Sequence, residues 1–275
     1  MAEFLSPQTL SATTAPTLLQ VQDLTCCMSG KRLFDAVSFA IRAGESVALL
    51  GPNGAGKSSL LRALAGELTP ASGNIQLHER RLADWRSRDL ARCRAVMPQQ
   101  VTLSFPLTVT EVVALGLHGR ERGHTRHPLV MELLNWLGVA HLAQRRYPTL
   151  SGGEQQRVQL ARVLVQIWQA PQAPLLLLDE CTSALDPRWQ HQVLHRLHEC
   201  RQRQFGLLWT VHDLNMAARY ADRILLLQEG KLVASGTPAQ VLTSQRLAAV
   251  YGIDVQIIDV QGIPQVVQLG FVSDR

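Results

Sequence analysis

The feature that most constrains the fold is a glycine-rich segment at residues 51–58, which matches the pattern G-x-x-x-x-G-K-[ST]. A short apolar run at residues 46–50 precedes it and is typical of a buried strand, while residues 57–65 show a helical pattern that ends at Gly66. Glycines let backbone N–H groups turn towards an anion, and the helix N-terminus adds the positive end of its dipole. Strand, loop and helix in this order predict a phosphate-binding loop in an α/β domain.

The side chains of this loop suit a nucleoside triphosphate with Mg²⁺. Lys57 is expected to reach the β- and γ-phosphates, Ser58 to bind Mg²⁺ through its hydroxyl, and Ser59 to add a phosphate hydrogen bond. The alternative, a glycine-rich turn that binds nothing, explains neither the lysine nor the hydroxyl. The predicted nucleotide-binding residues of this loop are Gly51, Pro52, Asn53, Gly54, Ala55, Gly56, Lys57, Ser58 and Ser59.

Two carboxylates follow the apolar run at residues 175–178. They would lie at the C-terminal edge of a strand, where ligands bind in open α/β sheets. We expect Asp179 to hold Mg²⁺ through its water shell and Glu180 to polarise the attacking water as general base. The alternative is that the two carboxylates simply end a strand and bind nothing. The presence of a phosphate loop in the same chain argues against this alternative.

A serine-glycine turn precedes a helical pattern at residues 155–168. Ser151, Gly152, Gly153 and Glu154 form this turn, and its position at a helix start predicts a second anion-binding site. The alternative is an ordinary capping turn in which Glu154 supports Ser151.

Two kinds of strand pattern occur along the chain. Residues 18–24 and 37–41 alternate apolar and polar positions, which predicts an antiparallel sheet near the N-terminus. The apolar runs at residues 175–178 and 207–211 are each followed by a helical stretch, which is typical of buried parallel strands with crossover helices. We therefore expect an α/β core.

The remaining segments predict two additions to this core. Residues 109–117 and 129–137 carry apolar positions at helical spacing, which indicates a helical insertion. Alternating segments at 254–260 and 265–269 indicate a small terminal β element.

Taken in order, these motifs resemble the nucleotide-binding domains of ABC transporters. The matching residues span about 18–243 and comprise the phosphate loop, Gln99, residues 150–154, residues 175–180, residues 183–186 and His212. The resemblance implies a P-loop NTPase fold of the ABC ATPase class, with a RecA-like parallel-sheet core, an N-terminal antiparallel β subdomain and a helical subdomain at about 101–165. The nucleotide-binding domain is expected at 18–260, between an N-terminal tail at 1–17 and a C-terminal tail at 261–275.

The resemblance also implies a head-to-tail homodimer, with each ATP between the phosphate loop of one subunit and the Ser151 turn of the other. It assigns catalysis to Glu180, His212 and Gln99, with His212 contacting the γ-phosphate and Gln99 sensing both that phosphate and Mg²⁺. Gln100 is a rival for the role of Gln99. Asp186 would tie the two sites together across the dimer. The expected cofactors are ATP and Mg²⁺, with Ser58, Gln99 and Asp179 as the Mg²⁺ ligands.

Two positions depart from the family pattern. Cys26 and Cys27 stand where an aromatic residue usually stacks on adenine, and Cys181 stands where proline is usual. A buried thiol behaves as a small hydrophobe, so hydrolysis should survive, and redox control by Cys181 is the less favoured alternative. The five cysteines are odd in number and lack CxxC spacing, which fits a reducing compartment.

No apolar stretch approaches the roughly 18 to 20 residues of a membrane-spanning helix, so action at a membrane requires a partner. The resemblance implies two transmembrane permease subunits, a periplasmic substrate-binding protein and a peripheral location on the cytoplasmic face of the inner membrane. Trp85 and residues 91–99 and 105–113 look most like importers of iron chelates, cobalamin and especially haem. Ferric siderophore or cobalamin import is the near alternative, and a soluble ABC ATPase such as an iron–sulfur assembly factor is a more distant one.

Two charged segments are interpreted as solvated helix faces. Residues 80–94 hold six arginines with few interleaved aromatic residues, so no nucleic-acid partner is predicted. His191, His195 and His198 share one helical face, yet no carboxylate or cysteine completes a metal site at matching spacing.

Overall fold

The computed structural model describes residues 15–271 apart from 29, 100–102 and 104. Its centre is a six-stranded sheet in the order β10-β9-β3-β8-β7-β6, parallel except for β10, which runs antiparallel to β9. The strands are β3 (Ser46–Leu50), β6 (Arg94–Met97), β7 (Leu175–Leu178), β8 (Gly206–Thr210), β9 (Arg223–Gln228) and β10 (Lys231–Gly236). Every residue of β3, β7 and β8 is buried, as expected for strands covered on both faces. The predicted α/β fold class is confirmed.

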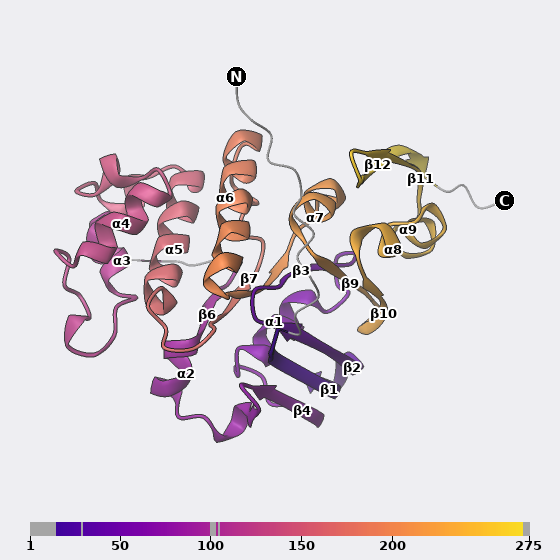
Figure 1. Ribbon diagram of the computed structural model, residues 1–275, viewed down its shortest axis with the longest axis horizontal. Coiled ribbons are helices and arrows are strands. Elements are labelled where there is room, and N and C mark those ends of the chain that lie inside the picture. The colour runs from indigo at the N-terminus through magenta and orange to yellow at the C-terminus, as the bar shows by residue number, and fades with distance from the viewer. Residues whose placement is uncertain (1–14, 29, 100–102, 104, 272–275) are drawn as a thin grey trace.

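A second sheet, antiparallel, carries the N-terminal part of the chain (Figure 1). Its order is β2-β1-β4-β5, with β1 (Thr17–Met28), β2 (Lys31–Arg42), β4 (Ser72–Leu77) and β5 (Arg80–Arg81). Leu18, Leu19, Val21 and Leu24 of β1 are buried, in agreement with the predicted half-buried strand.

The helices cover the parallel sheet and form a lobe at one end of the molecule, where α3, α4 and α5 lie together (Figure 1). One continuous hydrophobic cluster joins these three helices to the sheet. The α-helices are α1 (Lys57–Leu64), α2 (Ser87–Cys93), α3 (Val109–Ala114), α4 (Pro128–Trp136), α5 (Gly152–Ile167), α6 (Pro187–Glu199), α7 (Leu214–Tyr220), α8 (Pro238–Val241) and α9 (Ser244–Tyr251). The short 3₁₀ helices are η1 (Leu82–Asp84), η2 (Gly119–Glu121), η3 (Ala140–Leu142), η4 (Tyr147–Thr149) and η5 (Cys200–Arg203). In the described part of the chain, no helix has the length and apolar character needed to cross a membrane.

The C-terminal element is a hairpin of β11 (Ile253–Val260) and β12 (Ile263–Phe271). The boundary predicted at residue 260 falls in the turn of this hairpin, where Gln261 and Gly262 both have positive φ. The described part of the predicted C-terminal tail is therefore mostly a strand, paired to β11. Thr17, the last residue of the predicted N-terminal tail, already belongs to β1.

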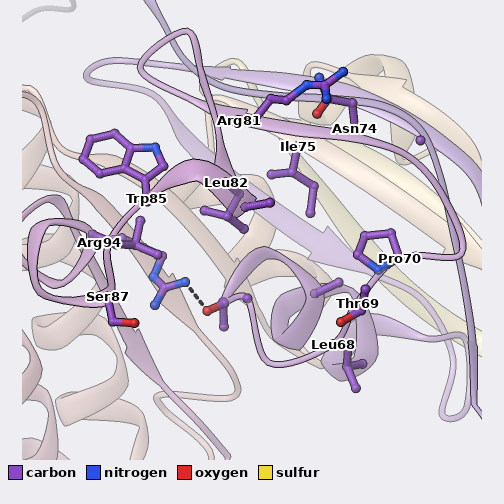
Figure 2. Close-up of a pocket in the computed structure, with 16 residues that line it drawn as sticks. Leu68, Thr69, Pro70, Asn74, Ile75, Arg81, Leu82, Trp85, Ser87 and Arg94 are labelled. Atoms are coloured by element: carbon purple, nitrogen blue, oxygen red, sulfur yellow. Dashed lines mark hydrogen bonds between the residues drawn. The ribbon is translucent and has the colours of Figure 1, made fainter.

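A cavity of about 530 Å³ lies between the end of α1, strand β4 and residues 81–94 (Figure 2). Arg94 points into this region, where its guanidinium donates to the carbonyl oxygens of Leu64 and Ala65 at the end of α1. The interpretation of residues 80–94 as one solvated helix face is therefore wrong for Arg94. Helix α2 ends at Cys93, and Arg94 is the first residue of β6.

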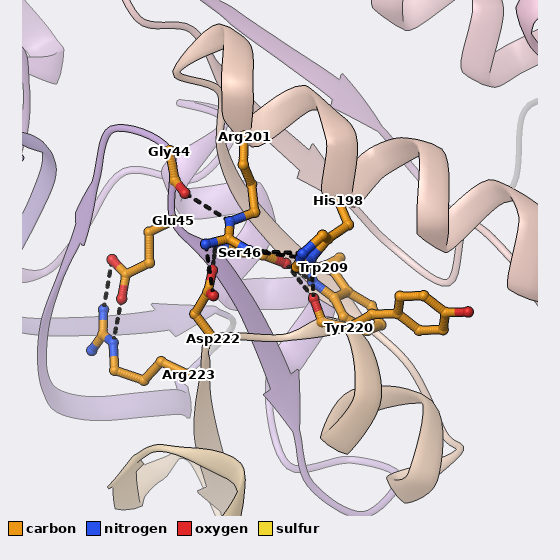
Figure 3. Close-up of polar contacts among 9 residues, drawn as sticks. All are labelled: Gly44, Glu45, Ser46, His198, Arg201, Trp209, Tyr220, Asp222 and Arg223. Atoms are coloured by element: carbon orange, nitrogen blue, oxygen red, sulfur yellow. Dashed lines mark hydrogen bonds and ion pairs between the residues drawn. The ribbon is translucent and has the colours of Figure 1, made fainter. Parts of the chain in front are cut away.

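Polar contacts fix the start of β3, the strand that leads into the phosphate loop (Figure 3). Ser46 donates its backbone N–H to Asp222 at 2.8 Å, and its hydroxyl accepts from the indole of Trp209 at 3.0 Å. Asp222 also pairs with Arg201 at 2.9 Å. Because Trp209 lies in β8 and Asp222 directly before β9, these contacts join β3 to both neighbouring strands.

Candidate active site

The phosphate loop connects β3 to α1 with a backbone that requires glycine at two positions. Gly51 has φ of +150° and Gly56 has φ of +99°. A Cβ atom at Gly51 would lie 2.2 Å from the carbonyl oxygen of Leu227, and one at Gly56 would lie 2.7 Å from that of Leu33. Both distances are shorter than a Cβ atom tolerates. The two glycines of the G-x-x-x-x-G-K-[ST] pattern are therefore required by sterics.

Lys57 is held inside this loop and is 8% exposed. Its ammonium group donates to the carbonyl oxygens of Gly51 at 2.6 Å and Pro52 at 3.0 Å. Burial lowers the pKa of Lys57, and the nearby carboxylates of Glu180 and Asp179 oppose that shift. Among the described residues, the hydrogen-bond partners of this ammonium group are neutral carbonyl oxygens, so a phosphate group would give it a directly bonded anion.

The three predicted Mg²⁺ ligands line one cavity. Ser58, Gln99 and Asp179 all border a space of about 260 Å³ next to the phosphate loop. Together they offer hydroxyl, amide and carboxylate oxygens, which are the ligands that Mg²⁺ prefers, so the residues fit this ion. The hydroxyl of Thr210 donates to Asp179 at 2.8 Å and fixes its carboxylate.

Three residues predicted to be catalytic meet at the carboxylate of Glu180. Nε2 of Gln99 donates to one carboxylate oxygen at 2.8 Å, and Nε2 of His212 lies 2.7 Å from the other. They follow the carboxyl ends of β6, β7 and β8, which are neighbours in the parallel sheet. Glu180 has φ of +51°, an uncommon conformation for a residue with a side chain and one that clusters at functional sites. Gln100, the rival of Gln99, lies outside the described residues.

Sequence reasoning missed two residues that support this cluster. The hydroxyl of Thr210 accepts from the backbone N–H of Glu180 at 2.8 Å, in addition to its bond with Asp179. Gln156 of α5 donates to the backbone carbonyl of Glu180 at 2.9 Å and accepts from Ala184 N at 3.0 Å. A threonine in an otherwise apolar strand was the available signal for Thr210. Gln156 gave no such signal.

The Ser151 turn forms the N-terminus of α5 as a capping box. The Ser151 backbone N–H donates to the Glu154 carboxylate at 2.8 Å, and the Ser151 hydroxyl accepts from Glu154 N at 3.4 Å. The first of these bonds lowers the pKa of Glu154. Gly153 packs against the backbone of Ala184, so this turn touches the loop that follows Glu180. Within the described ranges, no hydrogen bond joins the Ser151 turn to the phosphate loop.

Within the described ranges, the other residues that the sequence singles out take no part in the hydrogen bonds of this cluster. Asp186 caps the N-terminus of α6, because its carboxylate accepts from Trp189 N at 3.0 Å. Cys181 is buried, and burial raises the pKa of its thiol to about 12. Cys26 is buried and Cys27 exposed.

On α6, His191 bonds the Tyr220 hydroxyl at 2.9 Å, so this histidine is tied to α7 rather than fully solvated.

The fold and the site together define a P-loop nucleotide-binding domain. The sequence model of the family described as ABC transporter matches residues 34–183, and the chain belongs to this family. It therefore carries the ABC ATPase domain, which binds ATP, and the resemblance inferred from the motifs is confirmed.

Individual relatives agree with this membership. The hemin import ATP-binding protein HmuV of Shewanella denitrificans is 49% identical over 249 residues, which cover 89% of this chain and 97% of that protein. A chain of an inward-facing, metal-chelate type ABC transporter matches with a TM-score of 0.76 at 27% identity, covering 92% of this chain and 98% of the other. A bacterial ABC transporter cassette with a dimeric structure has a TM-score of 0.69 at 25% identity, covering 80% of this chain and 99% of the other.

Proposed function

We propose that the chain is the ATP-hydrolysing subunit that energises an importer of haem, bound peripherally to the cytoplasmic face of the bacterial inner membrane. The observation that carries the proposal is the convergence of Gln99 and His212 on Glu180, beside a cavity lined by Ser58 and Asp179. Membership of the ABC transporter family supports coupling of this chemistry to transport.

Each residue of the cluster has a role in hydrolysis. Lys57 binds the β- and γ-phosphates, and Ser58, Gln99 and Asp179 would hold Mg²⁺, which when bound would neutralise charge on those phosphates. Glu180 accepts a proton from the water whose oxygen attacks the γ-phosphorus, while the bond from that phosphorus to the bridging oxygen of ADP breaks. His212, beside the same carboxylate, contacts the γ-phosphate.

A second copy of the chain completes the site. The Ser151 turn offers the N-terminus of the 16-residue helix α5, whose backbone N–H groups and dipole favour an anion. In the proposed homodimer, Ser151, Gly152 and Gly153 of one subunit contact the ATP held by the phosphate loop of the other, and Asp186 lies at the same interface. The dimeric cassette among the structural relatives supports this arrangement.

Two transmembrane permease subunits and a periplasmic binding protein complete the proposed transporter. The relative from Shewanella denitrificans, named for hemin import, supports haem as the cargo. The metal-chelate type transporter supports a second candidate, import of a ferric siderophore. Cobalamin import is a further alternative within the same group.

Reconstitution tests both levels of the proposal. The chain is combined with its permease in lipid vesicles, and ATP hydrolysis is measured with the binding protein empty, haem-loaded or siderophore-loaded. We expect stimulation by the haem-loaded protein alone. Stimulation only by a siderophore-loaded protein would overturn the cargo, and absence of any ATP hydrolysis would overturn the enzymatic role.

A further inference from the structure

Among the described residues, the side-chain hydrogen bonds between the C-terminal hairpin and α7 come from one residue, Asn215. Its Oδ1 accepts from the backbone N–H of Val266 at 2.7 Å, and its Nδ2 donates to the Val266 carbonyl oxygen at 3.2 Å. A side-chain amide carries the same donor and acceptor pair as a peptide group. Asn215 therefore occupies the place of a neighbouring strand at the edge of β12, which lies beside α7 in Figure 1.

Asn215 lies in the first turn of α7, and this turn is also fixed from its N-terminal side. Asp213 caps the helix, and its carboxylate accepts from Asn215 N at 2.8 Å and from Met216 N at 3.1 Å. His212 directly precedes this cap, and β8 ends two residues before it at Thr210. The backbone of His212 is thus held between the sheet and a helix that β12 anchors.

The side chain of His212 itself has little else to hold it. It is 55% exposed, and among the described residues its one hydrogen-bond partner is Glu180. A groove of about 420 Å³ is lined by residues 212–215 together with Val266 and Gln268 of β12. The hairpin therefore flanks the histidine, and a shift of β12 would be transmitted through Asn215 to the His212 backbone.

We propose that Asn215 is a positioning residue for ATP hydrolysis: by binding β12 it holds the start of α7, and with it His212, against Glu180. The C-terminal hairpin is then a part of the hydrolytic machinery that contacts no nucleotide. This inference rests on the proposed function for the roles of Glu180 and His212.

The kinetic test uses the full-length chain with Asn215→Ala and with the isosteric Asn215→Asp. The aspartate keeps the acceptor for Val266 N but faces the Val266 carbonyl with a second acceptor. We expect kcat to fall about 10-fold to 100-fold in both variants, while KM for ATP changes less than about twofold, because small misplacements of a group at the reacting centre cost on this scale. Gln256→Ala, which removes an exposed amide from the same hairpin, is the matched control and should leave both constants unchanged.

A double-mutant cycle separates positioning from a general loss of structure. In a His212→Ala background, single-turnover hydrolysis should not fall further when Asn215→Ala is added, because residues that act through one contact are not additive. If Asn215→Ala lowers the rate of hydrolysis by the same factor in the wild type and in the His212→Ala background, the proposal is overturned.

A second readout does not depend on turnover. The imidazole NMR signal of His212, assigned by its loss in His212→Ala, should shift or broaden in Asn215→Ala and Asn215→Asp and stay unchanged in Gln256→Ala. An unchanged signal in the Asn215 variants rejects the positioning role even if no variant hydrolyses ATP. Failure of the proposed function is recognised separately, by Glu180→Gln protein that retains full hydrolysis.

Discussion

Nε2 of His212 lies 2.7 Å from one carboxylate oxygen of Glu180, and Gln99 donates to the other at 2.8 Å. A carboxylate oxygen accepts, so both neighbours are donors in this arrangement. Both carboxylate oxygens of Glu180 therefore already have a side-chain partner. If His212 and Gln99 turn to the γ-phosphate and Mg²⁺ when ATP binds, Glu180 is released to act on water at the moment the substrate is present.

Glu180→Gln should separate nucleotide binding from hydrolysis. Loss of a general base lowers kcat by about 10²-fold to 10⁴-fold. Binding of ATP should persist, so the variant should accumulate as an ATP-bound dimer in sedimentation experiments. Glu199→Gln, an exposed acid at the end of α6, is the control. A monomeric Glu180→Gln protein with full hydrolysis would remove the assignment of the base.

Lys57→Ala should weaken the binding of ATP, whereas Glu180→Gln affects hydrolysis. A hydrogen bond to a charged group contributes about 1.5–3 kcal/mol, which corresponds to a Kd for ATP about 10-fold to 100-fold higher. Calorimetric titration with ATP measures the change, and Lys31→Ala, which removes an exposed lysine from β2, serves as the control. Equal affinities of the Lys57 and Lys31 variants would contradict the role of Lys57.

Gly56→Ala and Gly54→Ala form a matched pair for the backbone of the phosphate loop. Both glycines have positive φ, but an added Cβ meets the Leu33 carbonyl at 2.7 Å from Gly56 and nothing within 4 Å from Gly54. Gly54→Ala should lower the free energy of unfolding by about 1–2 kcal/mol through φ alone, and Gly56→Ala by about 1–3 kcal/mol more. Urea denaturation without nucleotide measures both. Equal losses would show that the close approach at Gly56 relaxes.

The sequence predicts the core of this fold because its signals are local. The runs at β3 and β7 are continuous and apolar, and the glycines at 51 and 56 mark a backbone that other residues cannot adopt. The meeting of Gln99 and His212 at Glu180 has no local signal, because these residues lie 81 and 32 positions from Glu180. Only the family resemblance indicated that the three residues belong to one catalytic site, and it did not indicate their hydrogen bonds to one another.

The errors and omissions have physical causes of the same kind. The charge pattern predicts a solvated helix face for Arg94, because charge alone does not reveal that the helix ends at Cys93. Thr210 and Gln156 were missed because their roles depend on tertiary contacts with Glu180. The spacing of hydrophobic residues along the chain predicts helices and strands. Polar contacts between elements that are distant in sequence can be identified only in the structure.

Native-state thiol labelling should distinguish Cys27 from the other four cysteines. Cys27 is exposed, while Cys26, Cys93, Cys181 and Cys200 are buried. The thiolate is the reactive form, and burial raises the pKa of Cys181 and Cys200 to about 12. Iodoacetamide at pH 8 should therefore modify Cys27 alone, as read by mass spectrometry, and the remaining four only after unfolding. Labelling of Cys181 in the native protein, with loss of hydrolysis, would favour the redox control that we consider the lesser alternative.

Glu154 should give the Ser151 turn a stability that depends on pH. Its folded pKa is lowered from 4.5, first by the bond from Ser151 N, so folding favours the ionised form. The contribution is therefore present above the unfolded pKa and lost as pH falls through the lower folded value.

Comparison of wild type with Glu154→Gln tests this dependence, because glutamine keeps an acceptor for Ser151 N and loses only the charge near the N-terminus of α5. At pH 7 the wild type should be more stable by about 0.5 kcal/mol, the size of a charge interaction with a helix end at an exposed site. The difference in Tm should shrink as the pH falls below 4.5, where Glu154 becomes protonated. Glu229→Gln, in the exposed turn between β9 and β10, controls for removal of one surface charge. A Tm difference that stays constant from pH 7 to pH 3 would mean that the carboxylate does not stabilise this turn, and the capping hydroxyl of Ser151 would then hold the start of α5 alone.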